Sequence, residues 1–209
     1  MIEHFIYDFD GMIADSYQLF VRFCHEIAEN HGIKIPCDDN TLYRALKNTA
    51  YEGYLALECE DRLDYQAFLD EFHALQEKYR GEFQAFPGIK EILELAIAHG
   101  KKNYLYTHTG SVVADMLKNM GLFEYFTFIL DSTYGFPLKP APDALLFFLE
   151  KFQLDPKSCV MIGDRPLDAH AGMNAGMYGC LWDSEYLFTE TKVDFYTTEL
   201  TQIPTLLQI

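Results

Sequence analysis

The 209-residue chain is long enough for one large domain or for a domain with an insertion, and its 49% hydrophobic residues can fill a core. Its 16 basic and 32 acidic residues give a formal net charge of −16, which argues against binding of nucleic acid or anionic membranes, because both need a basic surface. No apolar run approaches the roughly 20 residues of a membrane span. The N-terminus lacks the pattern of a signal peptide, so we expect a cytoplasmic protein.

Five short apolar runs, each ending in turn or polar residues, predict buried strands. They span residues 4–9, 103–107, 126–130, 159–163 and 179–182. The runs do not alternate, which is typical of parallel strands with helices on both faces. Between them the apolar residues repeat with the helical period, as they do after Gly88, from Val113 and after Pro142. The order from residue 86 onward predicts a doubly wound, Rossmann-like α/β sheet with right-handed crossovers.

The interval between the first strand and the helix after Gly88 is too long to be a loop. Apolar residues at helical spacing predict one helix around residues 20–28, a shorter one in 38–48 and a third around 65–79. We therefore expect residues 17–84 to form an all-helical domain inserted over the carboxyl end of the first strand. Residues 1–16 and 85–209 are then the α/β core domain.

Acidic, hydroxyl and basic residues follow the predicted strands at the edge where open α/β sheets bind their ligands. Two acids lie at the end of the first strand, a threonine ends the second, a lysine follows the third, and two acids follow the fourth. In chain order these candidates are Asp8, Asp10, Thr107, Lys139, Asp164 and Asp168. Several acids with one lysine and one hydroxyl indicate a site for a divalent cation and an anion.

Oxygen ligands without histidine or cysteine suit a hard ion. Mg²⁺ fits because it usually takes one or two carboxylates, several waters and a phosphate oxygen. Such a cation also explains how the clustered acids tolerate one another. A metal alone does not require Lys139 and Thr107. Together with backbone N–H groups of the turn at Asp10 and Gly11, they could hold a phosphoryl group while one aspartate oxygen attacks phosphorus in line.

The segment DFDGMIADS resembles the DxDGxxxDS signature of the haloacid dehalogenase superfamily. The segments YTHTG, KPAPD and IGDRPLDAHAGMNAGM are similar to its further motifs, in the same order and spacing. The resemblance covers essentially the whole chain, because the helical cap of the family falls where residues 17–84 lie. It is strongest to the phosphoglycolate phosphatase group, which implies a Mg²⁺-dependent phosphatase. The implied substrate is a small phosphomonoester such as phosphoglycolate or a sugar phosphate.

The resemblance also implies a role for each matching residue. Asp8 looks like the nucleophile that forms an aspartyl-phosphate, and Asp10 looks like the general acid that protonates the leaving alcohol and later activates water. Thr107 resembles the hydroxyl that binds the phosphate, and Lys139 the cation that binds both phosphate and nucleophile. The implied metal site comprises Asp8, Asp10 and Asp164, with Asp168 holding a metal-bound water.

One position departs from the family pattern. The family usually has asparagine after the threonine of its second motif, where this chain has His108. Imidazole can still donate a hydrogen bond to a substrate oxygen, so we count His108 among the substrate-binding candidates, with Gly11 permitting a turn around the anion. Arg44 and Lys47 could also face the substrate from the short helix, and a solvated helix face is the alternative.

Three rival functions stay open at this point. A sugar phosphomutase would use Asp8 and Asp10 but return the phosphoryl group to its product. A haloacid dehalogenase would need no Mg²⁺, and the presence of Asp10 and Asp164 speaks against it. A catalytically silent binding protein could keep the same scaffold. We expect the partner to be a small phosphorylated metabolite, with no nucleic acid and no membrane, and the protein to be a monomer or weak homodimer.

Overall fold

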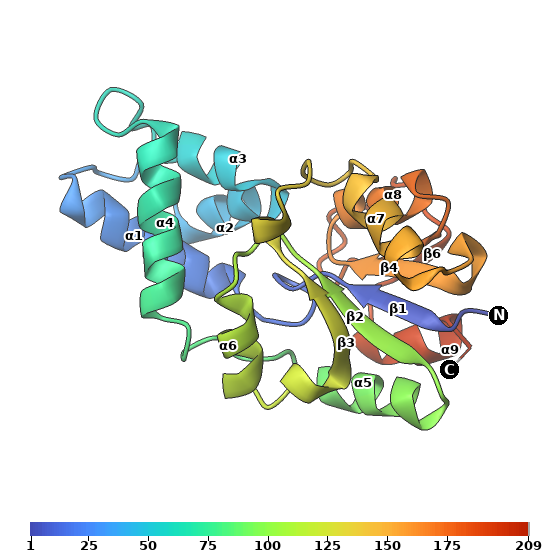
Figure 1. Ribbon diagram of the computed structural model, residues 1–209. Coiled ribbons are helices and arrows are strands. Elements are labelled where there is room, and N and C mark those ends of the chain that lie inside the picture. Colours follow the sequence, from blue (N-terminus) through green and yellow to red (C-terminus); the bar gives the residue numbers. More distant parts are fainter. Residues whose placement is uncertain (209) are drawn as a thin grey trace. The chain divides into compact units, whose positions relative to one another are not determined.

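The computed structural model describes residues 1–208 (Figure 1). Contacts within the chain divide it into two compact units, one formed by residues 1–14 with the chain from residue 85 onward, the other by residues 15–84. The role of the second unit as a cap, with the domain limits 17–84, stays a prediction. No helix within residues 1–208 is long and apolar enough to cross a membrane.

The first unit is built on a six-stranded parallel sheet. Its strands are β1 (His4–Tyr7), β2 (Lys102–Tyr106), β3 (Phe126–Leu130), β4 (Cys159–Gly163), β5 (Tyr178–Trp182) and β6 (Phe195–Thr197). They lie in the order β3-β2-β1-β4-β5-β6. The chain therefore adds strands first on one side of β1 and then on the other, which confirms the predicted doubly wound α/β fold. The change of direction between β1 and β4 is where such sheets bind ligands.

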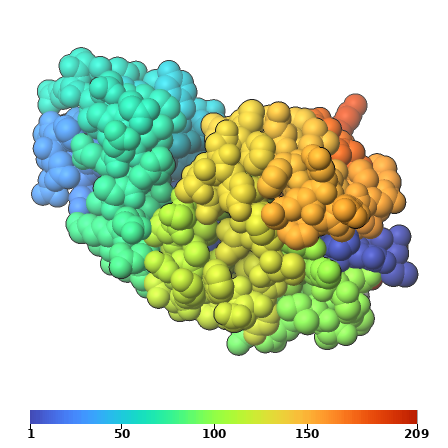
Figure 2. All heavy atoms as spheres, viewed as in Figure 1, coloured from blue at the N-terminus to red at the C-terminus, as the bar shows by residue number. Residues whose placement is uncertain are grey.

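Helices cover both faces of this sheet (Figure 1). They are α5 (Ile89–Ala98), α6 (Val113–Asn119), α7 (Asp143–Phe152), α8 (Pro166–Asn174) and α9 (Ile203–Leu206). One face packs against α7 and α8 in a buried cluster that includes Ile6, Tyr104, Phe148, Met161 and Ala171. In the view of Figure 2, atoms of the segment from β3 to the end of α7 lie in front of much of the rest of the sheet. Coverage of both faces explains why the strands read as unbroken apolar runs.

Every regular element between residues 15 and 84 is a helix. These helices are α1 (Tyr17–Asn30), α2 (Asp39–Asn48), α3 (Ala50–Leu55) and α4 (Tyr65–Lys78). Aromatic side chains of α1 and α4 pack against each other. The ring centroids of Phe20 and Phe23 lie 5.0 Å and 5.5 Å, respectively, from the ring centroid of Phe72. The side chains of Asp38 and Asp64 cap α2 and α4 by accepting a backbone N–H of the first turn. These aromatic side chains therefore belong to the core of this unit.

Some details differ from the sequence analysis. The strand β6 and the helices α3 and α9 are not among the predicted elements. The apolar repeat of α3 is interrupted by Gly53, where a Cβ atom would lie 2.4 Å from Cδ2 of Leu46, so this close contact between α2 and α3 needs a glycine. Ser16 occupies the N-cap position of α1, but its side chain makes no capping hydrogen bond.

Candidate active site

Three neighbouring strands of the first unit bring predicted residues to one edge of the sheet. Asp8 follows β1, Thr107 follows β2 and Asp164 follows β4, and these strands lie in the order β2-β1-β4. The backbone N–H of Asp8 donates to the carbonyl oxygen of Ile162 at 2.8 Å, which continues the pairing of β1 with β4 beyond the end of β1. Because parallel strands end at the same edge, residues far apart in sequence gather there.

Lys139 is the cation at the centre of this group. Its Nζ donates to Oδ1 of Asp8 at 2.5 Å and to Oδ1 of Asp168 at 2.8 Å. It also donates to the carbonyl oxygen of Tyr106 at 3.0 Å and lies 4.5 Å from the centroid of the Tyr106 ring. The side chain of Lys139 has no exposed surface. The ammonium group therefore joins the first and fourth motifs inside the protein.

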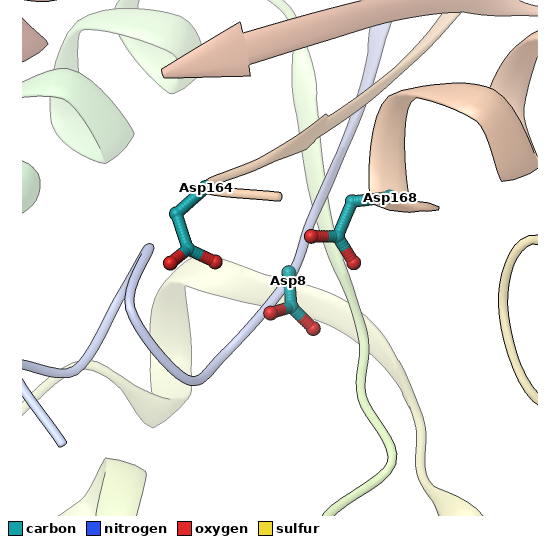
Figure 3. A group of neighbouring side chains, drawn as sticks. All are labelled: Asp8, Asp164 and Asp168. Atoms are coloured by element: carbon teal, nitrogen blue, oxygen red, sulfur yellow. The ribbon is translucent and has the colours of Figure 1, made fainter. Parts of the chain in front are cut away.

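Three buried carboxylates form the acidic part of the site. Ligand oxygens of Asp8, Asp164 and Asp168 all lie within 4.8 Å of one another, and Figure 3 shows the carboxylates turned toward a shared region. Glycine at position 163 makes this approach possible, because a Cβ atom there would lie 2.3 Å from Cβ of Asp168. Within the described residues, Oδ2 of Asp8 accepts no hydrogen bond. Such an all-oxygen group could hold a hard divalent cation.

Arg165 adds a second positive charge that the sequence analysis did not assign. Its Nη2 lies 4.0 Å from Oδ2 of Asp8, and its Nε lies 3.9 Å from Oδ1 of Asp164 and from Oδ2 of Asp168. Its backbone N–H donates to Oδ2 of Asp168 at 3.2 Å, so the start of α8 holds Asp168 in place. The GDxxxD motif could have suggested this residue, because Arg165 directly follows the first acid of the motif.

Burial and the neighbouring opposite charges shift the pKa values of these groups in opposite directions. Burial, with a contribution from Asp168, raises the pKa of Asp8 to about 6, although Lys139 and Arg165 oppose the rise. Burial would also raise the pKa of Asp168, but the charges of Lys139 and Arg165 lower it below the usual value. Burial opposes the charge of Lys139, yet its two aspartate partners raise its pKa. The charge of Asp8 is thus the least stabilised, and another cation beside it would favour the ionised form.

Asp10 lies outside the group of three carboxylates. It follows β1 in a tight turn in which Gly11 has a φ of 79°, a left-handed conformation that favours glycine. Oδ2 of Asp10 accepts a hydrogen bond from Oγ1 of Thr109 at 2.7 Å. The backbone N–H of Thr109 in turn donates to Oγ1 of Thr107 at 3.0 Å. The structure therefore links the second acid of the first motif to the second motif through Thr109, which the sequence analysis did not single out.

His108 lies against the segment that carries Lys139. The backbone N–H of Lys139 donates to Nε2 of His108 at 3.0 Å. A ring nitrogen that accepts a hydrogen bond carries no proton, so the proton of the neutral ring is assigned to Nδ1. Burial, followed by the charge of Lys139, lowers the pKa of His108 to about 3. The ring is therefore neutral at ordinary pH, and its proposed hydrogen bond to substrate stays a prediction.

Arg44 and Lys47 belong to the other unit of the chain. Both lie on α2, where Arg44 is exposed and Nζ of Lys47 lies 5.8 Å from the centroid of the Tyr17 ring. The aromatic contact lies within residues 15–84 and gives Lys47 a packing role there. Their predicted contact with substrate stays a prediction.

Comparison with known proteins identifies the family. The model of the family described as haloacid dehalogenase-like hydrolase matches residues 5–181, which include all four motifs. The chain belongs to the haloacid dehalogenase-like hydrolases. The predicted family and enzyme class, a hydrolase, are thereby confirmed.

Two curated relatives and one solved structure illustrate the similarity of this haloacid dehalogenase-like hydrolase. A phosphoglycolate phosphatase of Vibrio vulnificus is 33% identical over 57% of this chain and 53% of its own length. A phosphorylated carbohydrates phosphatase of Thermotoga maritima is 26% identical over 84% of this chain and 82% of its own. The crystal structure of a superfamily hydrolase from Geobacter sulfurreducens superimposes with a TM-score of 0.79. The match covers 99% of this chain and 100% of that one, at 21% sequence identity. The last comparison supports the fold.

Proposed function

We propose that this haloacid dehalogenase-like hydrolase is a Mg²⁺-dependent phosphatase that hydrolyses a small phosphomonoester through an aspartyl-phosphate on Asp8. The environment of Asp8 carries the proposal. Oδ1 is held by Lys139, whereas Oδ2 accepts no hydrogen bond within the described residues. A carboxylate with one oxygen fixed and the other available is suited to attack phosphorus.

Asp8, Asp164 and Asp168 would hold the Mg²⁺ ion. When bound, the ion would supply positive charge that offsets the charges of the carboxylates and the phosphate. Thr107 accepts a hydrogen bond from the backbone N–H of Thr109, so its own hydroxyl proton can be donated to a phosphate oxygen. The backbone N–H groups of Gly11 and Met12 donate to the carbonyl oxygens of Ala14 and Phe9, so they would bind a phosphate oxygen only by giving up these hydrogen bonds.

The reaction then has two steps. Oδ2 of Asp8 forms a bond to phosphorus while the bond from phosphorus to the ester oxygen breaks, and that oxygen takes a proton from Asp10 as the alcohol leaves. A water molecule next attacks the phosphorus of the aspartyl-phosphate and gives a proton to Asp10, while the bond from phosphorus to Oδ2 of Asp8 breaks. Inorganic phosphate leaves, and the carboxylate of Asp8 and the acid form of Asp10 are restored.

The proposed substrates are phosphoglycolate or a sugar phosphate. The names of the two relatives, a phosphoglycolate phosphatase and a phosphorylated carbohydrates phosphatase, support this class. The chain carries a net charge of −16, so an anionic substrate depends on local cations such as Lys139 and Arg165. Both cations lie at the carboxylate group, which favours binding of the phosphate end of the molecule there.

The test is phosphate release from a panel of small phosphomonoesters, with Mg²⁺ and with EDTA, for the native protein and Asp8→Asn. The amide has the shape of the carboxylate but is a poor nucleophile, so we expect metal-dependent turnover in the native protein and none above background in the variant. Asp61→Asn is the matched control, because this exposed aspartate lies in the other unit. Turnover by Asp8→Asn, or equal turnover in EDTA, would refute the proposal.

A further inference from the structure

Thr109 holds the side chain of Asp10 through a short hydrogen bond. Its Oγ1 lies 2.7 Å from Oδ2 of Asp10, and the residue is only 4% exposed. The backbone of Thr109 is fixed on both sides of this contact. Its N–H donates to Oγ1 of Thr107 at 3.0 Å, and its carbonyl oxygen accepts the N–H of Ser132 at 3.2 Å. The hydroxyl of Thr109 is therefore presented to Asp10 from a well-anchored position.

A threonine hydroxyl has one proton to donate, and Thr109 gives it to Oδ2 of Asp10. That bond restricts rotation of the carboxyl group. We infer that Thr109 is a positioning residue that fixes the orientation of the Asp10 carboxyl group for proton transfer to the leaving oxygen. This inference rests on the proposed function, because it requires Asp10 to be the general acid.

The inference makes the effect of Thr109 depend on the leaving group. When the bond from phosphorus to an alkyl alcohol breaks, the oxygen receives the electron pair and needs the proton of Asp10. When p-nitrophenol leaves, its oxygen carries the electron pair as a stable anion and needs no proton. A misplaced Asp10 therefore slows hydrolysis of an alkyl phosphate more than hydrolysis of p-nitrophenyl phosphate.

The experiment measures the rate constant kcat/KM for glycerol phosphate and p-nitrophenyl phosphate with the Mg²⁺-loaded full chain. This rate constant covers only the steps up to loss of the alcohol, before Asp10 acts in hydrolysis of the aspartyl-phosphate. Thr109→Val keeps the shape of the side chain and removes the hydroxyl, whereas Thr109→Ser keeps the hydroxyl. We expect Thr109→Val to lower kcat/KM about 10-fold to 100-fold more for glycerol phosphate than for p-nitrophenyl phosphate. Thr109→Ser should restore the native ratio of the two rates.

A matched control comes from the same unit, where the hydroxyl of exposed Thr133 also donates to an aspartate, Asp131. Thr133→Val should leave the ratio of the two rates unchanged. The ratio does not depend on the fraction of active protein, so partial misfolding of a variant does not affect it. If Thr109→Val does not fold, Thr109→Ala is measured in the same way, because it keeps both backbone hydrogen bonds.

Asp10→Asn separates failure of the inference from failure of the proposed function. One outcome is that Asp10→Asn lowers the rate for glycerol phosphate more than the rate for p-nitrophenyl phosphate, while Thr109→Val lowers both rates equally. In that case the proposed role of Asp10 stands and the role of Thr109 is refuted. If Asp10→Asn also lowers both rates equally, Asp10 is not the general acid, and both proposals are overturned. Selective loss in both variants, with rescue by Thr109→Ser, supports both.

Discussion

Replacing His108 by asparagine is expected to make the stability of the protein less sensitive to acid. In the folded chain, burial and the nearby charge of Lys139 lower the pKa of His108 from 6.5 to about 3. Protonation would also remove the lone pair of Nε2 that accepts the backbone N–H of Lys139. The folded state therefore resists protonation of His108 across the range in which the unfolded chain accepts it.

The size of the effect follows from these two pKa values. The unfolded chain binds a proton at His108 below about pH 6.5, whereas the folded chain does not do so above about pH 3. The unfolded state thus binds more protons between these values, and the free energy of unfolding falls as the pH falls. Between pH 8 and pH 5 the loss from this one residue is about 2 kcal/mol. Asparagine does not titrate, so the free energy of unfolding of the variant should not show this decrease.

The assay is urea unfolding of the native protein and His108→Asn in EDTA at pH 8 and pH 5. The difference between the two proteins in their loss of stability isolates the contribution of this residue, because their other titrating groups are the same. His99→Asn is the control, since His99 is exposed at the end of α5. If His108→Asn loses as much stability as the native protein between the two pH values, the neutral, buried state assigned to His108 is wrong.

Lys139→Met should destabilise the metal-free protein by about 3–5 kcal/mol, because it leaves Asp8 and Asp168 buried without the cation they share. Urea unfolding in EDTA measures this, and a loss below about 1 kcal/mol would contradict it. Mg²⁺ should raise the thermal unfolding temperature and EDTA should reverse the rise, since an ion bound by the folded carboxylates stabilises the folded state by mass action. An unchanged melting curve would argue against the metal site. Gly163→Ala should cost about 1–3 kcal/mol, because its Cβ would lie 2.3 Å from Cβ of Asp168. Gly110→Ala, whose Cβ would meet its nearest atom at 3.7 Å, should cost little, and equal losses would refute the steric argument.

The sheet could be predicted from sequence wherever both faces of a strand are covered. All five residues of β4 are buried, so the strand reads as an unbroken apolar run and its limits match the predicted 159–163. The strand β6 lies at the edge of the sheet, and two of its three residues are only half-buried. A run so short and so partly covered has no apolar pattern that distinguishes it from a loop.

The candidate site could be predicted only in part, for a related reason. Asp8, Thr107 and Asp164 could be grouped because each follows a strand, and strand topology alone brings them to one edge. The contact of Thr109 with Asp10 depends instead on the direction of a side chain in a loop. Nothing in the sequence distinguishes its hydroxyl from that of Thr133, which also donates to an aspartate but is exposed. Such contacts are set by packing and become visible only in three dimensions.

The buried ammonium group of Lys139 has a consequence for substrate binding. An ammonium has three protons, and here one goes to Asp8, one to Asp168 and one to the carbonyl oxygen of Tyr106. A phosphate oxygen can bind this lysine only by replacing one of those acceptors. A hydrogen bond to substrate therefore replaces a hydrogen bond within the protein. The free energy needed to break that internal bond reduces the affinity that Lys139 contributes to substrate binding.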